Sequence, residues 1–210
     1  MNRRLAILAA LAAALTGCRT IALRAAAGAV AESGEGYGRD DDPELVRAAV
    51  PFGLKTMEGL LDGQPEHLGL LAALASGFTQ FGYAFVQGDA DAADLQGKLA
   101  EARAGRDRAR RLYLRARDYG LRGLEGRHRG LAAALRGARE PGRALAAAER
   151  EDVPLLYWTA TAWALAISNG KGDMELVAEL PSPVAMMERA LALDEAWGEG
   201  ALHESFATYD

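Results

Sequence analysis

Few residues of this 210-residue chain have types and spacing that could do chemistry. It has one cysteine, Cys18, and three histidines, His67, His128 and His203, which lie far apart in the sequence. No histidine has a partner at the short spacing that a metal site uses. The chain also has no nucleophile elbow, no P-loop and no paired-histidine zinc motif. We therefore expect no catalytic residues, no metal and no cofactor; a site assembled from residues distant in sequence is the alternative.

Cys18 ends the segment Leu15-Thr16-Gly17-Cys18, which follows two arginines and a short apolar run. This order is typical of a secretory signal, and the apolar run is shorter than the ~20 residues that span a bilayer. The segment resembles the lipobox of bacterial lipoproteins. That resemblance implies cleavage before Cys18, a lipid on its sulfur and a second acyl chain on its amine. Arg19, in place of aspartate, slightly favours the outer membrane. The alternative is an ordinary signal peptide.

The sequence predicts three parts. Residues 1–17 are the lipoprotein signal peptide, and residues 18–42 are the lipidated cysteine and a flexible tether rich in glycine and charge. Residues 43–210 are the folded domain, which begins with Asp42 as helix N-cap and Pro43 in the first turn. Because export separates the chain from the nucleic acids of the cytoplasm, we expect no nucleic-acid partner. We expect the protein in the periplasm, attached to a membrane through its lipid.

The domain is predicted to be all-α. Apolar residues recur at helical spacing, β-branched residues are few, and no segment alternates as a strand would. Glycine, proline and asparagine clusters separate the periodic segments, one break being expected at Gly88-Asp89. The expected helices are 43–62, 66–88, 91–125, 127–137, 141–149, 153–169, 173–179, 182–194 and 197–208.

The alternation of bulky and small residues resembles the tetratricopeptide repeat, a helical hairpin of about 34 residues. With Pro65 as the closing proline of one repeat, the next has matching residues at Leu71, Leu74, Ala75 and Phe78. The expected partner positions are Ala109, Tyr113 and Ala116 for the first hairpin, and Trp158, Ala162 and Leu165 against Met187 and Ala190 for the second. Both hairpins are longer than the standard repeat. The sequence thus predicts a degenerate α-solenoid, with a generic helical bundle as the alternative.

Two groups of aromatic residues are candidates for a ligand or partner groove. Phe78, Phe81 and Phe85 recur at three- and four-residue spacing on one predicted helix. Tyr157, Trp158 and Trp163 lie on another. Helical solenoids have concave surfaces that bind ligands or peptides. Aromatic residues at helical spacing also form cores, and the sequence does not separate the two interpretations.

Charge is distributed unevenly along the domain. Between Lys98 and Arg150 basic residues outnumber acidic ones by nine, and between Glu151 and Asp210 acidic residues outnumber basic ones by nine. Most of the arginines fall on the polar face of a predicted helix. A solvated helix face is the simpler interpretation; contact with anionic lipid or an acidic partner is the alternative.

Four stretches resemble the T component of TRAP transporters, a family of periplasmic tetratricopeptide-repeat lipoproteins. They are DPELVRAAVPFGLKTMEGLL at 42–61, LASGFTQFGYAFVQ at 74–87, LLYWTATAW at 155–163 and LDEAWGEGALH at 193–203. The resemblance implies a homotrimer with an apolar pore or cavity, and association with a TRAP solute-binding protein. It also implies delivery of a hydrophobic small molecule to the permease. No catalytic residues are carried over.

Two further expectations follow. Members of this family usually continue beyond the position where this chain stops, so we expect the domain to be truncated at its C-terminus. A transport accessory is the first functional hypothesis. An envelope scaffold that assists protein assembly is the second, because the same anchor and fold would serve it. An envelope hydrolase is the third, and it lacks a recognisable site.

Overall fold

The computed structural model describes residue 28, residues 40–137 and residues 140–203. Cys18, the predicted signal peptide, most of the predicted tether and the end of the last predicted helix lie outside this part of the chain. Throughout the described part, regular structure is helical and no strand is found, which confirms the all-α prediction.

Helix α2 (Pro43–Gly63) begins as the sequence predicts. The Asp42 side chain accepts hydrogen bonds from the backbone N–H groups of Glu44 and Leu45, at 3.1 and 3.0 Å, and Pro43 occupies the first turn. Helix α2 buries a stripe of apolar residues, while Phe52 on its outer side is 78% exposed. Helix α2 therefore packs through one face only.

The next helix is longer than predicted. Helix α3 (Leu68–Phe81) continues through a π-helical turn, η2 (Gly82–Gln87), into α4 (Gly88–Leu95), so the expected break at Gly88-Asp89 is wrong. Gly88 has ordinary helical angles, φ −55° and ψ −44°. Asp89 is bound by Arg47 of α2 and fits the helix without ending it. The turn comes at Gly97 instead, where φ is +74° and glycine is favoured.

Helix α5 (Leu99–Arg127), the longest of the described helices, runs back along α3, η2 and α4, and a series of short elements follows it. They are α6 (Leu131–Gly137), α7 (Pro141–Ala144), η3 (Leu145–Ala147) and η4 (Arg150–Asp152). Helix α8 (Val153–Ser168), α9 (Met174–Ala178), α10 (Pro181–Leu193) and η5 (Trp197–Gly200) complete the described chain.

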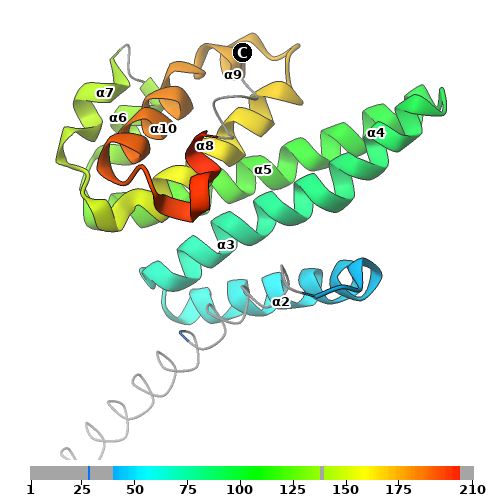
Figure 1. The fold of residues 1–210 in the computed structure, drawn as a ribbon, viewed down its shortest axis with the longest axis horizontal. Helices are drawn as coiled ribbons and strands as arrows, with labels where there is room; N and C mark the ends of the chain where they lie inside the picture. Colours follow the sequence, from blue (N-terminus) through cyan, green and yellow to red (C-terminus); the bar gives the residue numbers. More distant parts are fainter. Residues whose placement is uncertain (1–27, 29–39, 138–139, 204–210) are drawn as a thin grey trace, which may run out of the picture.

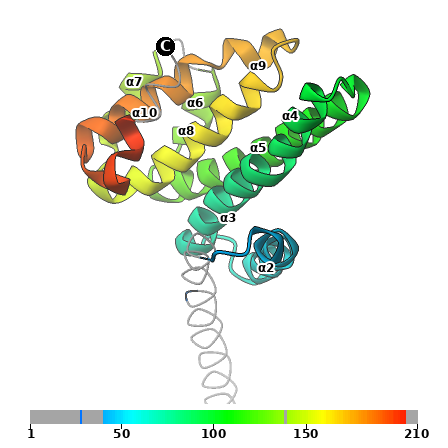
Figure 2. The same cartoon turned by 45° about the vertical axis from the view of Figure 1, so that its right-hand side comes forward.

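The long helices form two antiparallel pairs (Figure 1). One pair is α3–α4 with α5, the other is α8 with α10, and the two pairs meet where α5 packs against α8. Helix α5 packs against α3 and α4 on one side and against α8 on the other, and α8 packs against α10. Both predicted hairpins are therefore present. Figure 2 shows α2 crossing beneath α3, with α6, α7 and α10 grouped at the opposite side of the molecule. The assignment of the two hairpins to the tetratricopeptide class remains an interpretation of the sequence.

The core lies along α5 and α8. The positions predicted for the first repeat are buried, and so are those of its partner helix: Leu71, Leu74, Ala75, Phe78, Ala109, Tyr113 and Ala116. Small residues allow close approach where α5 crosses its neighbours. A Cβ added at Gly120 would lie 1.9 Å from Thr159 Oγ1 of α8, so glycine is required at that crossing.

The helix from Leu68 to Leu95 is long and apolar enough to cross a membrane by those two measures alone. Half of its most apolar window is buried inside the protein, as in the core helix of a soluble domain. We therefore treat it as part of the packed domain.

Candidate functional site

The structure separates the six aromatic residues that were candidates for a groove. Phe78, Phe81 and Trp163 are buried in the core, and Trp163 has no exposed surface. Phe85, Tyr157 and Trp158 are half-buried. Tyr157 lies between Trp158 and Trp197, with ring centroids 5.0 and 4.7 Å apart. Among these predicted residues, only the half-buried ones present ring surface that a ligand or partner could reach.

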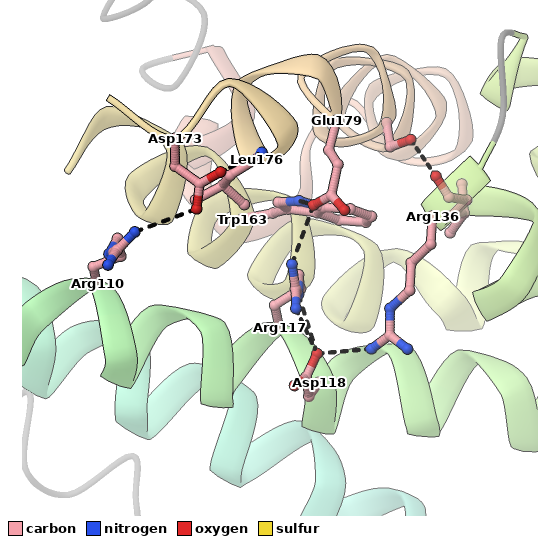
Figure 3. A network of polar contacts seen from close by, with 10 residues as sticks. Arg110, Arg117, Asp118, Arg136, Trp163, Asp173, Leu176 and Glu179 are labelled. Carbon is pink, nitrogen blue, oxygen red and sulfur yellow. Dashed lines mark hydrogen bonds and ion pairs between the residues drawn. The ribbon is translucent and has the colours of Figure 1, made fainter. Parts of the chain in front are cut away.

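Trp163 is instead the centre of a polar network between α5, α8 and α9 (Figure 3). Its indole N–H donates to Glu179 Oε2 at 2.8 Å, and the same oxygen lies 3.2 Å from Arg117 Nη1. The Arg117 guanidinium is also 5.2 Å from the Trp163 ring centre. A buried indole needs an acceptor for its N–H, so this carboxylate satisfies Trp163 and Arg117 together.

The network continues along the surface of α5. Asp118 Oδ1 accepts from Arg117 at 3.1 Å and from Arg136 of α6 at 2.8 Å. Two turns nearer the start of α5, Arg110 pairs with Asp173 at 3.5 Å. Several α5 arginines thus connect this helix to the C-terminal helices, so at these positions the positive charge is paired within the domain.

A second polar cluster joins α5 to α2. Glu58 is almost buried and accepts from Tyr119 Oη at 2.6 Å and from Lys55 Nζ at 2.5 Å, and it also contacts Arg115. Burial acts to raise the pKa of Glu58, but hydrogen bonds from Lys55 and Tyr119 and the charge of Arg115 outweigh it, so this pKa is lowered. The carboxylate therefore stays ionised and fixes α2 onto α5.

A hollow of about 440 Å³ opens on α5 between these two networks. Its lining residues all come from α5: Arg111, Leu114, Arg115, Asp118, Tyr119 and Arg122. The Tyr119 ring stacks on Phe78 at 6.1 Å, and Arg122 lies 5.8 Å from the Tyr119 ring. Within the described part of the chain, the side chain of Arg111 has neither an ion-pair nor a hydrogen-bond partner. The hollow thus combines an aromatic and apolar floor with a positively charged rim.

A second, more polar hollow of about 640 Å³ lies where the α8–α9 turn meets α5. Asp107, Arg110, Lys171 and Asp173 are among its lining residues, so charges of both signs surround it. Asn169 at its edge donates to Gln87 Oε1 at 2.9 Å, and the same oxygen accepts from Tyr113 Oη at 2.8 Å. This shared oxygen connects the π-helical turn to α5 and α8.

Among the described residues, the most deeply buried acidic side chain lies near the C-terminal end of α5. Asp152 is fully buried; Oδ2 lies 2.7 Å from His128 Nε2 and accepts from the Glu149 backbone N–H at 2.8 Å, and Oδ1 contacts Arg127. Both carboxylate oxygens of Asp152 thus have partners within the domain, and we interpret the cluster as structural. Among the described residues, no three histidine, cysteine or acidic side chains are grouped as a metal site would require.

Sequence reasoning had not singled out the residues that line the α5 hollow as a site. It identified the arginine-rich face of the predicted helix but not Tyr119 with its partner Glu58, which lies 61 residues earlier in the chain. The one available signal was an aromatic residue one turn from several arginines. Which of these arginines would stay unpaired depends on contacts from other helices.

The chain matches one family model, described as TRAP transporter T-component, over residues 39–210. A protein from Treponema pallidum (strain Nichols), itself described only as an uncharacterized protein, is 32% identical over 168 residues. That match covers 79% of this chain and 52% of the Treponema protein. The chain therefore spans about half the length of the curated relative it matches.

Proposed function

Since the chain belongs to the TRAP transporter T-component family, as the sequence resemblance predicted, we propose that it is a lipid-anchored accessory of a TRAP transporter. It works in the cell envelope, on the periplasmic side of a membrane, and binds the solute-binding protein of the system. The observation that carries this proposal is the family match, which begins before the first residue of α2 and covers the whole described domain.

The hollow on α5 is the surface that fits such a partner best. Arginine and tyrosine are enriched at protein interfaces, and the hollow offers both around an apolar floor. Arg111 is available for a new ion pair because it has no partner among the described residues. The complementary surface on the solute-binding protein is acidic, with an apolar or aromatic side chain at its centre.

The half-buried aromatic group of Tyr157, Trp158 and Trp197 is the proposed contact for a hydrophobic small molecule passing through the system. Its three rings present apolar surface that is not fully covered by the domain. Lipidation at Cys18, attachment to the outer membrane and assembly as a homotrimer complete the proposal; they derive from the N-terminal sequence and from the family resemblance.

The test is binding between the lipid-anchored protein and the solute-binding protein of the same TRAP system, measured by titration calorimetry in mild detergent. We expect Arg111→Glu to weaken binding at least tenfold, because it places a negative charge opposite an acidic surface. Arg103→Glu is the matched control, since it makes the same charge change at an exposed position of α5 outside the hollow.

Absence of binding by the unaltered protein contradicts the proposed function. In that event, reduced levels of outer-membrane proteins in a deletion strain favour the scaffold alternative. Equal affinity of the two variants contradicts only the assignment of the hollow, and leaves the partner in place.

A further inference from the structure

Three side chains of the α5 hollow are held by the segment that ends α2. Tyr119 Oη donates to Glu58 Oε1 at 2.6 Å, and Arg115 forms an ion pair with the same carboxylate. Arg122 Nη2 donates to the carbonyl oxygen of Pro65, two residues after α2 ends, at 2.9 Å. The lining residues all belong to α5, but three of the six are thus fixed from outside that helix.

Glu58 lies behind the hollow and does not line it. Its side chain is almost buried, and Lys55 Nζ is its third partner, at 2.5 Å. A buried carboxylate that binds several donors fixes the positions of those donors relative to one another. Glu58 therefore acts on the hollow through Arg115 and Tyr119, which do line it.

The two side chains that Glu58 holds also rest on Phe78 of α3. The Tyr119 ring stacks on the Phe78 ring with 6.1 Å between centroids, and the Arg115 guanidinium lies 4.9 Å from the centre of the same ring. Each side chain is thus restrained by the carboxylate at its polar end and by an aromatic surface along its length. An arginine restrained in this way has lost rotamer freedom before a partner protein binds.

Arg111 is the contrasting member of the hollow, because its side chain has no partner within the described part of the chain. A binding partner has to order such a free side chain, which weakens association, whereas a side chain that is already ordered adds no such cost. Arg115 is already ordered, and its side chain is still 43% exposed. It can therefore donate further hydrogen bonds to a partner from a fixed position.

We propose that Glu58 is a positioning residue of the hollow, which presets Arg115 and Tyr119 in the arrangement that receives the solute-binding protein. The inference rests on the proposed function of the hollow. It adds that affinity depends on a residue of α2 that lies outside the contact surface. Because α2 packs mainly against α3, the docking of α2 on α3 and the affinity of the hollow are coupled.

Two substitutions of Glu58 separate position from charge. Glu58→Gln keeps the size of the side chain and removes its charge, whereas Glu58→Asp keeps the charge and withdraws the carboxylate by one carbon–carbon bond. Glu44→Gln is the matched control, since Glu44 also lies on α2 and pairs with the arginine three residues later, at 3.7 Å, but is remote from the residues of the hollow. Affinity is measured by titration calorimetry, with circular dichroism to show that each variant is folded.

We expect both Glu58 variants to bind the solute-binding protein about fivefold more weakly, because binding must then order a free arginine side chain. Glu44→Gln should bind as the unaltered protein does. If Glu58 acted through its charge alone, Glu58→Gln would bind an acidic partner more tightly and Glu58→Asp would be unchanged. The inference is overturned if either Glu58 variant binds as tightly as the unaltered protein, or more tightly.

A second measurement needs no partner protein. Phenylglyoxal modifies accessible arginine side chains, and mass spectrometry follows the modification of each arginine separately. In the unaltered protein Arg115 should react more slowly than Arg111, because Glu58 holds its guanidinium. In both Glu58 variants Arg115 should react faster, by about threefold or more, while Arg111 is unchanged. An unchanged rate at Arg115 also overturns the inference.

The two measurements separate this inference from the proposed function. If the unaltered protein does not bind the solute-binding protein, the proposed function fails, and the rate at Arg115 still decides whether Glu58 positions the hollow. If the unaltered protein binds and the Glu58 variants bind equally well, the inference fails and the proposed function stands.

Discussion

Gly120→Ala is the substitution whose effect follows most directly from the geometry. Gly120 lies where α5 crosses α8, and an added Cβ would be 1.9 Å from Thr159 Oγ1 and 2.9 Å from Thr159 Cβ. Thr159 is fully buried, and its hydroxyl donates to Leu155 O at 2.5 Å. Rotating the hydroxyl away breaks this bond and leaves the Cβ contact, so the two helices must move apart.

The expected loss is the balance of two opposing effects. Overpacking of a core costs about 3 kcal/mol when the backbone must shift. Replacing glycine by alanine inside a helix contributes about 1 kcal/mol in the other direction. The free energy of unfolding should therefore fall by about 2 kcal/mol, which corresponds to a decrease of about 6 °C in Tm for a domain of this size.

Gly59→Ala in α2 is the matched control, because no atom lies within 4 Å of its added Cβ. It should raise the free energy of unfolding by about 1 kcal/mol. Urea titration followed by circular dichroism measures both variants and their m-values. If Gly120→Ala were as stable as the unaltered protein, the crossing would be looser than described and the reasoning would be wrong. Thr159→Ala should recover part of the loss in the double variant.

Two further predictions concern the buried polar clusters. Asp152→Asn should lower the free energy of unfolding at pH 7 by about 3 kcal/mol, because Arg127 and His128 lose the carboxylate between them. Burial acts to raise the pKa of Asp152, but hydrogen bonds from Glu149 and His128 and the nearby positive charges lower it overall. Since the folded pKa lies below the unfolded value, this stabilisation is present above about pH 4 and is lost as pH falls through the folded pKa. Urea midpoints measured from pH 7 to pH 2 should therefore fall less steeply for Asp152→Asn; parallel curves contradict the assignment. Trp163→Phe should cost about 2 kcal/mol, since Glu179 loses the indole donor and the ring leaves a gap. A change below about 0.5 kcal/mol in the same titration argues against a buried bond between these side chains.

Local signals in the sequence were sufficient for most helix boundaries. Asp42 and Pro43 define the start of α2, and the glycine and proline clusters near residues 64 and 170 end helices as expected. The break at Gly88 was wrong because glycine can adopt helical angles when the neighbouring helices hold it there. Arg47 bonds to Asp89 and Tyr113 bonds to Gln87, on either side of Gly88, and neither partner is close in sequence.

The candidate site was harder to predict than the fold. Helical spacing placed Phe78, Phe81 and Phe85 on one face, but spacing does not tell which of them another helix covers. Trp163 and Glu179 are 16 residues apart, and Glu58 and Tyr119 are 61 apart. Pairings of this kind depend on how the helices cross, so the α5 hollow becomes visible only in the folded chain.

The π-helical turn at Gly82–Gln87 changes the angular phase of the helix that runs from α3 into α4. A π turn uses one residue more than an α-helical turn, so the side chains beyond it are rotated by about 100° relative to a regular continuation of α3. Helix α3 can therefore follow one packing register against α5 and α8, while α4 follows another, mainly against α5. The π-helical turn thus sets the angle between the packing face of α3 and that of α4. Removing one residue from it would keep this segment helical but turn the faces of Ala90 and Asp91 away from α5.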